Sequence, residues 1–218
     1  MSNLINNTSK VGIFGTSGMA KEVGNIARDL KLQPVYVAIS EQDAESFDSD
    51  EIIILEKHIF KYLDIPYVVG IANGTVCKLI HDRYRGKLNF TNLIHPNVTF
   101  GYKQQSKIEE AEGVIIAAGS RFTCGITVGD FCIFNQNVTI AHDCEVGNYV
   151  HVAPGVNVSG NVRIGDGSWI GAGAVVNQGS STKKLNIGKN TIIGSGAVVI
   201  KDCKKDSVYV GVPASKVK

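Results

Sequence analysis

The sequence lacks a long apolar run, a strong charge imbalance and an apolar N-terminal leader. No apolar run approaches the ~18 residues that a membrane-spanning helix needs. The formal net charge of the 218 residues is only +2, so charge gives no argument for a nucleic acid or an anionic membrane as a partner. Residues 1–10 are polar and contain no apolar segment typical of a secretory signal. These absences favour a folded protein with no membrane span and no nucleic-acid partner.

The five cysteines show no paired spacing and are odd in number, which favours reduced thiols in a cytoplasmic protein. Cys132 and Cys144 fall in an apolar series described below, so we expect them to be small buried side chains. A zinc site made by His142, Cys144 and His151 is disfavoured, because Cys144 should point into the core while His142 occupies a turn and points away. We therefore expect no metal.

A period of six residues runs through residues 116–176. Every sixth residue there is aliphatic or Phe, and a second series two residues earlier is small or β-branched and never charged. An amphipathic helix repeats near 3.6 residues and a two-faced strand at 2, so a period of six fits neither. The first series is Ile116, Phe122, Val128, Phe134, Ile140, Val146, Val152, Val158, Ile164, Ile170 and Val176, and the second is Val114, Ser120, Ile126, Cys132, Val138, Cys144, Val150, Val156, Val162, Ser168 and Ala174.

A repeat of six is typical of a solenoid in which each hexad forms one wall and three hexads form one coil of a triangular prism. Gly129 and Gly147 directly follow inward aliphatic residues, where a turn needs a residue without a Cβ clash, and Asn135 takes the same place because Asn tolerates an unusual φ. The register breaks at residues 178–186, which we interpret as a looped excursion. Beyond it the inward series continue with Ile187, Ile193 and Val199, preceded by Leu185, Thr191 and Ala197.

The first part of the chain has a different pattern, in which short apolar runs alternate with segments whose apolar residues recur at helical spacing. Residues 11–14 form an apolar run that ends in a glycine turn at residues 15–18, and residues 19–30 have apolar positions at helical spacing. Further strands are expected at residues 35–39, 52–55 and 67–71, and further helices at residues 57–63 and 75–84. This alternation predicts a small α/β domain with a parallel sheet.

The glycine turn leaves two interpretations open. Backbone amides at a helix N-terminus attract phosphate, which favours a nucleotide site. The spacing of Gly12, Gly15 and Gly18 is not the dinucleotide pattern, however, and no acidic residue closes the second strand to hold a ribose. A tight connection from strand to helix, with no ligand, explains the glycines equally well.

The hexads carry a family resemblance. Val-x-Ile-Gly-Asp-Gly at residues 162–167, Trp-Ile-Gly-Ala-Gly at 169–173 and Val-Gly-Val-Pro-Ala at 210–214 resemble the left-handed β-helix of the hexapeptide acyltransferases. With the α/β part and Leu-Ile-His-Pro at 93–96, the chain resembles the family of sialic-acid O-acetyltransferases and bacillosamine-type and perosamine N-acetyltransferases. The resemblance implies a Rossmann-like nucleotide-sugar-binding domain at residues 1–93. It also implies a left-handed β-helix acetyltransferase domain with a C-terminal tail at residues 94–218.

The resemblance also implies which residues of the first domain meet the substrate. Gly15, Ser17 and Gly18 would lie near the pyrophosphate or sugar of a UDP-, dTDP- or GDP-linked sugar, together with Asn73 after the fourth strand. Acidic residues that meet the nucleoside after the second strand in some relatives are replaced here. The positions hold Ile39 and Ser40, with Glu41 and Asp43 slightly later, so the identity of the nucleotide stays open.

His142 is the candidate catalytic base. It follows inward Ile140 by two residues, which places it in a turn and exposed at a corner of the prism, beside Asp143. Imidazole is poised near neutral pH to take a proton from an attacking amine, and a neighbouring carboxylate can hold the ring in one tautomer. The resemblance implies this role for the His142–Asp143 pair. The alternative is an ordinary exposed histidine in a turn.

The resemblance implies further substrate-binding residues on the β-helix. It also implies a trimer that binds acetyl-CoA between neighbouring subunits. His151 should project outward from a wall and face another direction than His142, since nine residues are half of an eighteen-residue coil. The family pattern places His151 in the acetyl-CoA cleft near the thioester, and Asn135 on the amino sugar unless it is only a turn residue. The amide of Gly160 would stabilise the oxyanion, unless Gly160 is a plain turn glycine. The remaining acetyl-CoA residues would be Gly171, Ala172, Gly194 and Gly211.

These observations predict an acetyl-CoA-dependent N-acetyltransferase that acts on the 4-amino group of a nucleotide-linked amino-dideoxy sugar in bacterial surface glycan biosynthesis, such as that of lipopolysaccharide or capsule. Direct attack without an acyl-enzyme is expected, because no cysteine is predicted beside His142 in an outward position. A sialic acid O-acetyltransferase with the same fold and base is the first alternative. A non-catalytic hexad scaffold is the second, and a hexapeptide metal hydratase would need a third histidine in the solenoid.

Overall fold

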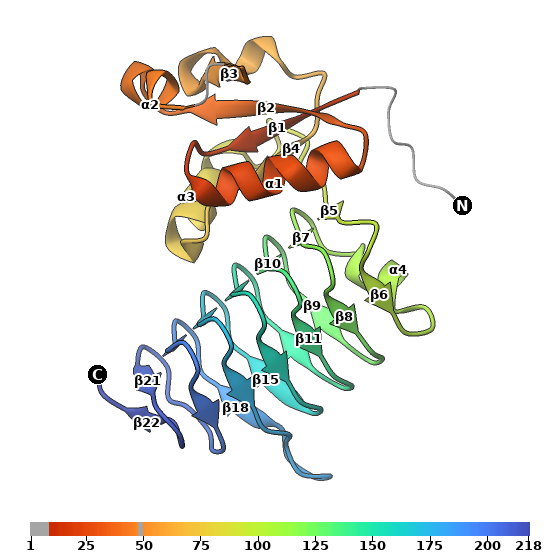
Figure 1. Ribbon diagram of the computed structural model, residues 1–218, viewed down its shortest axis with the longest axis vertical. Helices are drawn as coiled ribbons and strands as arrows, with labels where there is room; N and C mark the ends of the chain where they lie inside the picture. Colours follow the sequence, from red (N-terminus) through yellow and green to blue (C-terminus); the bar gives the residue numbers. More distant parts are fainter. Residues whose placement is uncertain (1–8, 48–49) are drawn as a thin grey trace.

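The chain folds into an N-terminal α/β part and a C-terminal prism of parallel strands (Figure 1). The computed structural model describes residues 9–47 and 50–218. The expectation of no secretory signal concerns residues 1–10, of which the first eight lie outside the described part. None of the helices in that part is long and apolar enough to cross a bilayer.

The N-terminal sheet has four parallel strands in the order β3-β2-β1-β4. Its strands are β1 (Lys10–Phe14), β2 (Gln33–Ala38), β3 (Ile52–Leu55) and β4 (Tyr67–Val69), which confirms the four expected strands. Helix α1 (Gly18–Asp29) follows β1, and α3 (Gly74–Tyr84) follows β4, as expected from their apolar spacing. The side chains that face the sheet from α1 are Ala20, Val23, Ile26 and Ala27, and all four are buried.

The helix expected at residues 57–63 is present as η1 (Glu56–Lys61), a 3₁₀ helix that no side chain caps and that connects β3 to β4. Two further short helices were not expected. Helix α2 (Glu41–Glu45) was not expected and begins with a capping box between Ser40 and Asp43. Helix α4 (Gln104–Ile108) is also additional.

The prism has three walls of parallel strands that fit the expected left-handed β-helix. Each strand pairs with the strand of the next coil, so Ile133 lies beside His151 and His151 beside Trp169, eighteen residues apart each time. The first wall is β5 (Leu93–Ile94), β7 (Ile115–Ile116), β10 (Ile133–Phe134), β13 (His151–Val152), β16 (Trp169–Ile170), β19 (Ile192–Ile193), β21 (Val208–Val210) and the antiparallel β22 (Ser215–Lys216). The second wall is β6 (Thr99–Phe100), β8 (Arg121–Phe122), β11 (Thr139–Ile140), β14 (Asn157–Val158), β17 (Val175–Val176) and β20 (Val198–Val199). The third wall is β9 (Thr127–Val128), β12 (Glu145–Val146), β15 (Val162–Ile164) and β18 (Leu185–Ile187).

Both inward series form the core of the prism, as the period of six predicts. All their members are buried except Val128, which is half-buried. Glycines that follow the inward residues are needed for close approach between coils, because a Cβ on Gly129 would lie 2.7 Å from the backbone of Gly147. The expectation of an unusual φ at Asn135 is wrong. The left-handed asparagines stand instead at other turns, at Asn137, Asn161 and Asn190.

The N-terminal part packs against the first wall. Outward side chains of that wall, Ile115 and Ile133, belong to one apolar cluster with the buried face of α1. Polar contacts add to this junction, including His81 Nδ1 to the Tyr149 hydroxyl at 2.7 Å. Figure 1 shows β7 and β10 on the side of the N-terminal part, and β9, β11 and β15 on the far side. The corner between the second and third walls is therefore opposite the N-terminal part.

Candidate active site

His142 and Asp143 form a hydrogen-bonded pair at the corner between the second and third walls. They lie in the turn from β11 to β12, where Asp143 has a left-handed φ of 60°. The Nδ1 atom of His142 lies 2.8 Å from Oδ2 of Asp143. When Nδ1–H donates to the Asp143 carboxylate, Nε2 is the nitrogen of the neutral ring that can accept a proton. The two side chains are 57% and 64% exposed, so substrates can reach the pair from outside the prism.

Gly160 lies directly beside the imidazole of His142, one coil further along the chain. A Cβ built on Gly160 would lie only 2.4 Å from His142 Nε2. The two turns are joined by a backbone hydrogen bond of 2.8 Å from Asn161 N to His142 O. Among the described residues, no acceptor takes the amide proton of Gly160. The structure thus brings the candidate base next to a backbone amide that has no acceptor among the described residues.

Cys124 occupies the same corner one coil before His142, eighteen residues earlier. It is exposed, and its carbonyl oxygen accepts a hydrogen bond of 3.0 Å from Asp143 N. The expectation that no outward cysteine lies beside His142 is therefore wrong, although the eighteen-residue spacing could have revealed it. Within the described part of the chain, no hydrogen bond joins the Cys124 thiol to His142. The nearby Cys144 points into the prism, where burial raises the pKa of its thiol.

His151 and Asn135 form a second polar pair, on the first wall. His151 stands in the outward row of that wall but is only 7% exposed, and Asn135 is 5% exposed. The Asn135 Nδ2 atom lies 3.0 Å from His151 Nε2, and the His151 ring stacks on Trp169 with centroids 6.0 Å apart. Burial lowers the pKa of His151 to about 4, so its ring is neutral near pH 7.

Each member of this pair keeps one buried polar atom without a partner, Asn135 Oδ1 and His151 Nδ1. Buried polar atoms in folded proteins are nearly always hydrogen-bonded, and leaving one unpaired costs roughly 1–3 kcal/mol. An unpaired donor and acceptor side by side fit a ligand that carries both kinds of group, such as an amide. This pairing was not visible in the sequence.

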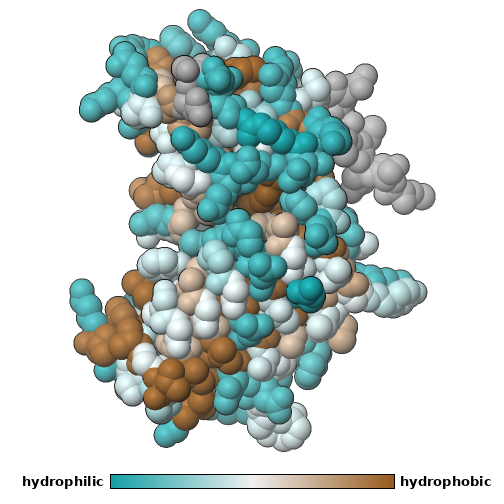
Figure 2. All heavy atoms as spheres, in the orientation of Figure 1, coloured by the Kyte–Doolittle hydropathy of each residue, from teal (hydrophilic) through white to brown (hydrophobic). Residues whose placement is uncertain are grey.

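The other residues expected to bind acetyl-CoA continue from this pair along one edge of the first wall. A Cβ on Gly171 would meet the backbone of Gly194 at 2.7 Å, and a Cβ on Gly194 would meet the side chain of Val210 at 2.8 Å. Ala172 is exposed beside Gly171, and Gly211 follows Val210 with a φ of 93°. Exposed apolar side chains accompany this edge, and Figure 2 shows a hydrophobic surface at the C-terminal end of the prism. These side chains are Trp169, Ile192, Val210 and Val212.

The third group of expected site residues lies at the carboxyl edge of the N-terminal sheet. Gly15 has a φ of 114°, and Ser17 is the N-cap of α1 without a side-chain capping bond. Gly18 faces open space, since no atom lies within 4 Å of a Cβ built there. Asn73 caps α3 with its Oδ1 atom, so that oxygen is occupied and its amide nitrogen remains for a ligand.

The acidic residues after β2 have partners of their own. Asp43 is held in the capping box of α2 by Ser40. Glu41 pairs with Lys57 at 3.0 Å. The side chain that is left exposed at the end of β2 is Ile39, which is 72% exposed.

The three groups do not meet within one chain. His142, Asp143 and Gly160 lie at the corner opposite the first wall, whereas the His151 edge and the N-terminal group lie on the side of the first wall. His142 and His151 therefore face different directions, as their spacing of nine residues indicated. In the described part of the chain, no three His, Cys, Asp or Glu side chains lie close enough together to hold a metal ion.

Comparison with known proteins identifies relatives along most of the chain, although no family model matches it. A GDP-perosamine N-acetyltransferase of Escherichia coli is 32% identical over 132 residues, and the match spans 58% of this chain and 58% of that enzyme. A galactoside O-acetyltransferase of Escherichia coli is 30% identical over 158 residues, which are 60% of this chain and 75% of that enzyme.

Two solved structures have the same fold. WeeI from Acinetobacter baumannii is 28% identical with a TM-score of 0.84, over 95% of this chain and 99% of that one. A variant of perosamine N-acetyltransferase from Caulobacter crescentus, in complex with CoA and GDP-perosamine, is 24% identical with a TM-score of 0.83, over 100% of both chains.

Proposed function

This chain belongs to the hexapeptide-repeat acetyltransferases, and on that premise we propose that it transfers an acetyl group from acetyl-CoA to the 4-amino group of a nucleotide-linked amino-dideoxy sugar. One observation carries the proposal. The Nε2 atom of His142, whose ring is oriented by Asp143, lies against Gly160, whose amide has no acceptor among the described residues. A base and an oxyanion donor in contact are what direct acyl transfer to an amine requires.

The reaction can be written with these groups alone. The sugar nitrogen attacks the carbonyl carbon of the thioester, and His142 Nε2 takes one proton from that nitrogen. The Gly160 N–H donates to the oxyanion of the tetrahedral intermediate, and Asp143 stabilises the imidazolium. The C–S bond then breaks, and the imidazolium returns its proton to the sulfur of CoA. No acyl-enzyme is formed in this scheme.

Acetyl-CoA would lie along the edge of the first wall from His151 to Gly211. The unpaired Nδ1 of His151 and Oδ1 of Asn135 offer a donor and an acceptor, which match the amide groups of the pantetheine arm. Asn135 can alternatively accept from the amino group of the sugar. Glycines and Ala172 keep the edge narrow, and Trp169 supplies apolar surface beside it.

The nucleotide-linked sugar would be held by a Rossmann-like domain at residues 1–93, next to the acetyltransferase domain at residues 94–218. The sheet order β3-β2-β1-β4 supports this assignment, because doubly wound nucleotide-binding sheets begin with the same order. The open N-terminus of α1, at Gly15, Ser17 and Gly18, suits a pyrophosphate, and Asn73 suits the sugar. We infer a cytoplasmic enzyme of bacterial surface glycan biosynthesis.

We further propose a homotrimer with each active site between two subunits. The His142 corner lies opposite the first wall and the N-terminal part of its own chain. Only a neighbouring subunit can therefore bring the His151 edge and a bound sugar to the base. The partner would also cover the exposed pair and exclude water, which strengthens the electrostatic interactions inside the site.

The proposal is tested by measuring CoA release from acetyl-CoA with a panel of UDP-, dTDP- and GDP-linked 4-amino sugars. At least one of them should be acetylated on nitrogen, as mass spectrometry would show. Replacing the base, His142→Ala, should lower kcat by about two to four orders of magnitude. The matched control is His58→Ala, which removes an exposed histidine of η1 and should leave kcat unchanged. Wild-type turnover in the His142→Ala variant would exclude the proposed base.

A second candidate is acetylation of a sugar hydroxyl, as in a sialic acid O-acetyltransferase. The similarity to a galactoside O-acetyltransferase over 75% of that enzyme favours it. The same base would then take a proton from a hydroxyl group. Including free sialic acids and galactosides in the panel separates the two, because the acetylated atom of the product identifies the reaction.

A further inference from the structure

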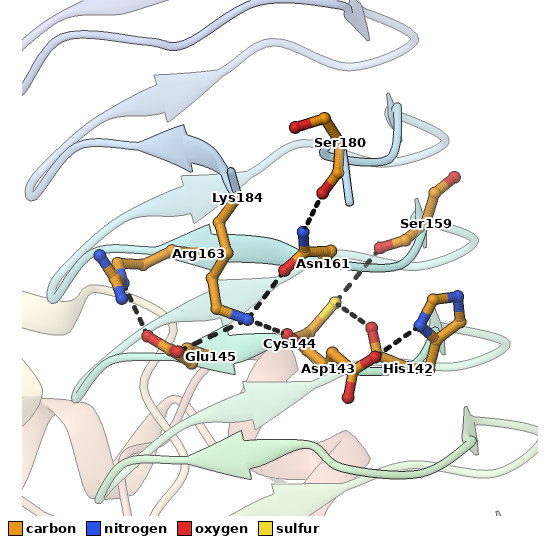
Figure 3. A network of polar contacts seen from close by, with 9 residues as sticks. All are labelled: His142, Asp143, Cys144, Glu145, Ser159, Asn161, Arg163, Ser180 and Lys184. Atoms are coloured by element: carbon orange, nitrogen blue, oxygen red, sulfur yellow. Dashed lines mark hydrogen bonds and ion pairs between the residues drawn. The ribbon is translucent and has the colours of Figure 1, made fainter. Parts of the chain in front are cut away.

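Lys184 stands at the end of the looped excursion between β17 and β18, and its side chain returns to the corner that carries His142. The side chain is only 23% exposed. Its Nζ atom donates to the carbonyl oxygen of Asp143 and, at 3.1 Å, to Oδ1 of Asn161. Figure 3 shows the ammonium group between the two turns, with the Glu145 carboxylate 3.5 Å away.

The excursion itself is anchored on the turn that carries Gly160. Gly179 N donates to Gly160 O at 3.0 Å, and Leu185 N donates to Asn161 O at 3.1 Å. The Asn161 side chain also donates to the carbonyl oxygen of Ser180. The excursion is thus attached to the Gly160 turn, and Lys184 near its end reaches the His142 turn.

We propose that Lys184 is a positioning residue for acetyl transfer, because its ammonium ties the turn of the base to the turn of the oxyanion donor. This inference rests on the proposed function. The bond to Asp143 O restrains the peptide that carries the Asp143 carboxylate, and this carboxylate orients His142. The bond to Asn161 fixes the residue next to Gly160. The distance between the candidate base and the donor then depends on one half-buried cation.

The Glu145 carboxylate adds to this restraint. It lies 3.5 Å from the Lys184 ammonium and is itself paired with Arg163 at 2.7 Å.

The decisive variant is Lys184→Met, which keeps the length of the side chain and removes its charge. We expect kcat to fall about 10- to 100-fold, the usual effect of a misplaced catalytic group, with KM for both substrates within about twofold of wild type. Lys184→Arg, which keeps the charge and the donors, should restore most of the activity.

The matched control is Lys183→Met in the same excursion. Lys183 is 73% exposed and pairs with Asp202 at 2.6 Å, away from the His142 turn. This variant should retain the wild-type kcat. Wild-type kcat in Lys184→Met would overturn the proposal. So would a loss of activity that follows unfolding, with no rescue by Lys184→Arg.

A measurement without turnover separates this inference from the proposed function. Crystal structures of the wild type and of Lys184→Met would compare the distance between His142 Nε2 and the Gly160 amide. A changed distance in Lys184→Met supports the positioning role even if no sugar of the panel is acetylated. An unchanged distance rejects it even if the enzyme is active. If Lys184→Met does not fold, Lys184→Gln provides the same uncharged comparison.

Discussion

At the scale of single residues, position 160 requires glycine because the His142 ring lies beside it, and not because of its backbone conformation. It is absent from the glycines with a positive φ, so an L-residue could adopt its conformation. The place of a Cβ is instead taken by His142 Nε2, 2.4 Å away. The smallest possible side chain therefore displaces the candidate base.

Gly160→Ala should lower kcat about 100-fold, the cost of moving a catalytic group by about 1 Å. The free energy of unfolding should change by less than about 1 kcal/mol, because His142 is exposed and can swing away. Gly86→Ala is the control, since Gly86 has a φ of 71° and no atom near its Cβ position. That variant should lose about 1–2 kcal/mol of stability but keep its kcat. Wild-type kcat in Gly160→Ala would show that His142 does not act from this position.

His151 makes the stability of the fold dependent on pH. Its folded-state pKa of about 4 lies below the unfolded value of 6.5, so the unfolded chain binds the proton more readily. The stabilisation is complete above pH 6.5 and is lost as the pH falls toward 4. Between pH 7.5 and pH 5, this one group should remove about 2 kcal/mol from the free energy of unfolding.

Urea unfolding at the two pH values measures this loss, and His151→Gln is the informative variant because it cannot be protonated. The decrease between pH 7.5 and pH 5 should be about 2 kcal/mol smaller in His151→Gln than in the wild type. His58→Ala serves as the control, since His58 is exposed. Equal decreases in wild type and His151→Gln would show that His151 is not buried in its neutral form.

At the scale of elements, the N-terminus of α1 has neither a side-chain cap nor a close neighbour at Gly18. Ser17 makes no capping bond, Gly18 has no neighbour within 4 Å of its Cβ position, and the first turn contains no acidic residue. The positive end of the helix dipole is thus left for an external anion. Helix α3 differs, because Asn73 caps its own backbone.

Gly18→Asp should separate helix stability from substrate binding. A carboxylate in the first turn favours the helix by about 0.3–1 kcal/mol, so Tm should be unchanged or raised. The same charge should repel a pyrophosphate and raise KM for the nucleotide-linked sugar about tenfold or more, with KM for acetyl-CoA unchanged. Gly18→Ala fills the space without charge and is the control. An unchanged KM for the sugar in Gly18→Asp would place the pyrophosphate elsewhere.

At the scale of the whole molecule, the candidate base and the proposed substrate domain lie on opposite sides of the same prism. The N-terminal part is held there by the apolar cluster that joins α1 to Ile115 and Ile133. It is also held by the contact between His95 and Asp29 at 2.9 Å. These contacts fix the N-terminal part to the first wall, so a sugar bound there should not reach His142 of the same chain. A single chain should therefore be inactive.

Mixing two inactive variants tests this arrangement directly. His142→Ala lacks the base but has an intact substrate domain. Gly18→Asp keeps the base but has an impaired sugar site. Suppose that each site takes the base from one subunit and the sugar from its neighbour. In an equal mixture of the two variants, about half of the sites have an intact base, and about half of those have an intact sugar site in the neighbouring subunit. Random mixed trimers should therefore regain about a quarter of the wild-type activity at low sugar concentration. Light scattering should give the mass of three chains. No recovery in verified mixed oligomers would place each site within one chain.

The sequence by itself determined the prism, its inward rows and the corner of His142. Hexad spacing states which side of a wall each residue occupies, so Ile140 and Val146 were assignable to the core and His142 to the outside without any tertiary contact. The same spacing located the excursion. The resemblance of the motifs to the hexapeptide acetyltransferases then supplied the chemistry, and the relatives confirm an acyltransferase.

Tertiary structure decided the features that depend on contacts between coils and between domains. Lys184 reaches Asp143 across forty-one positions of sequence. His151 was correctly assigned to an outer face, but its 7% exposure could not be derived from the spacing. Periodicity sets the direction of a side chain, whereas burial and hydrogen bonding depend on what packs against it. That is why the sequence located the candidate base, and only the fold revealed that the candidate base and the proposed sugar site of one chain lie on opposite sides.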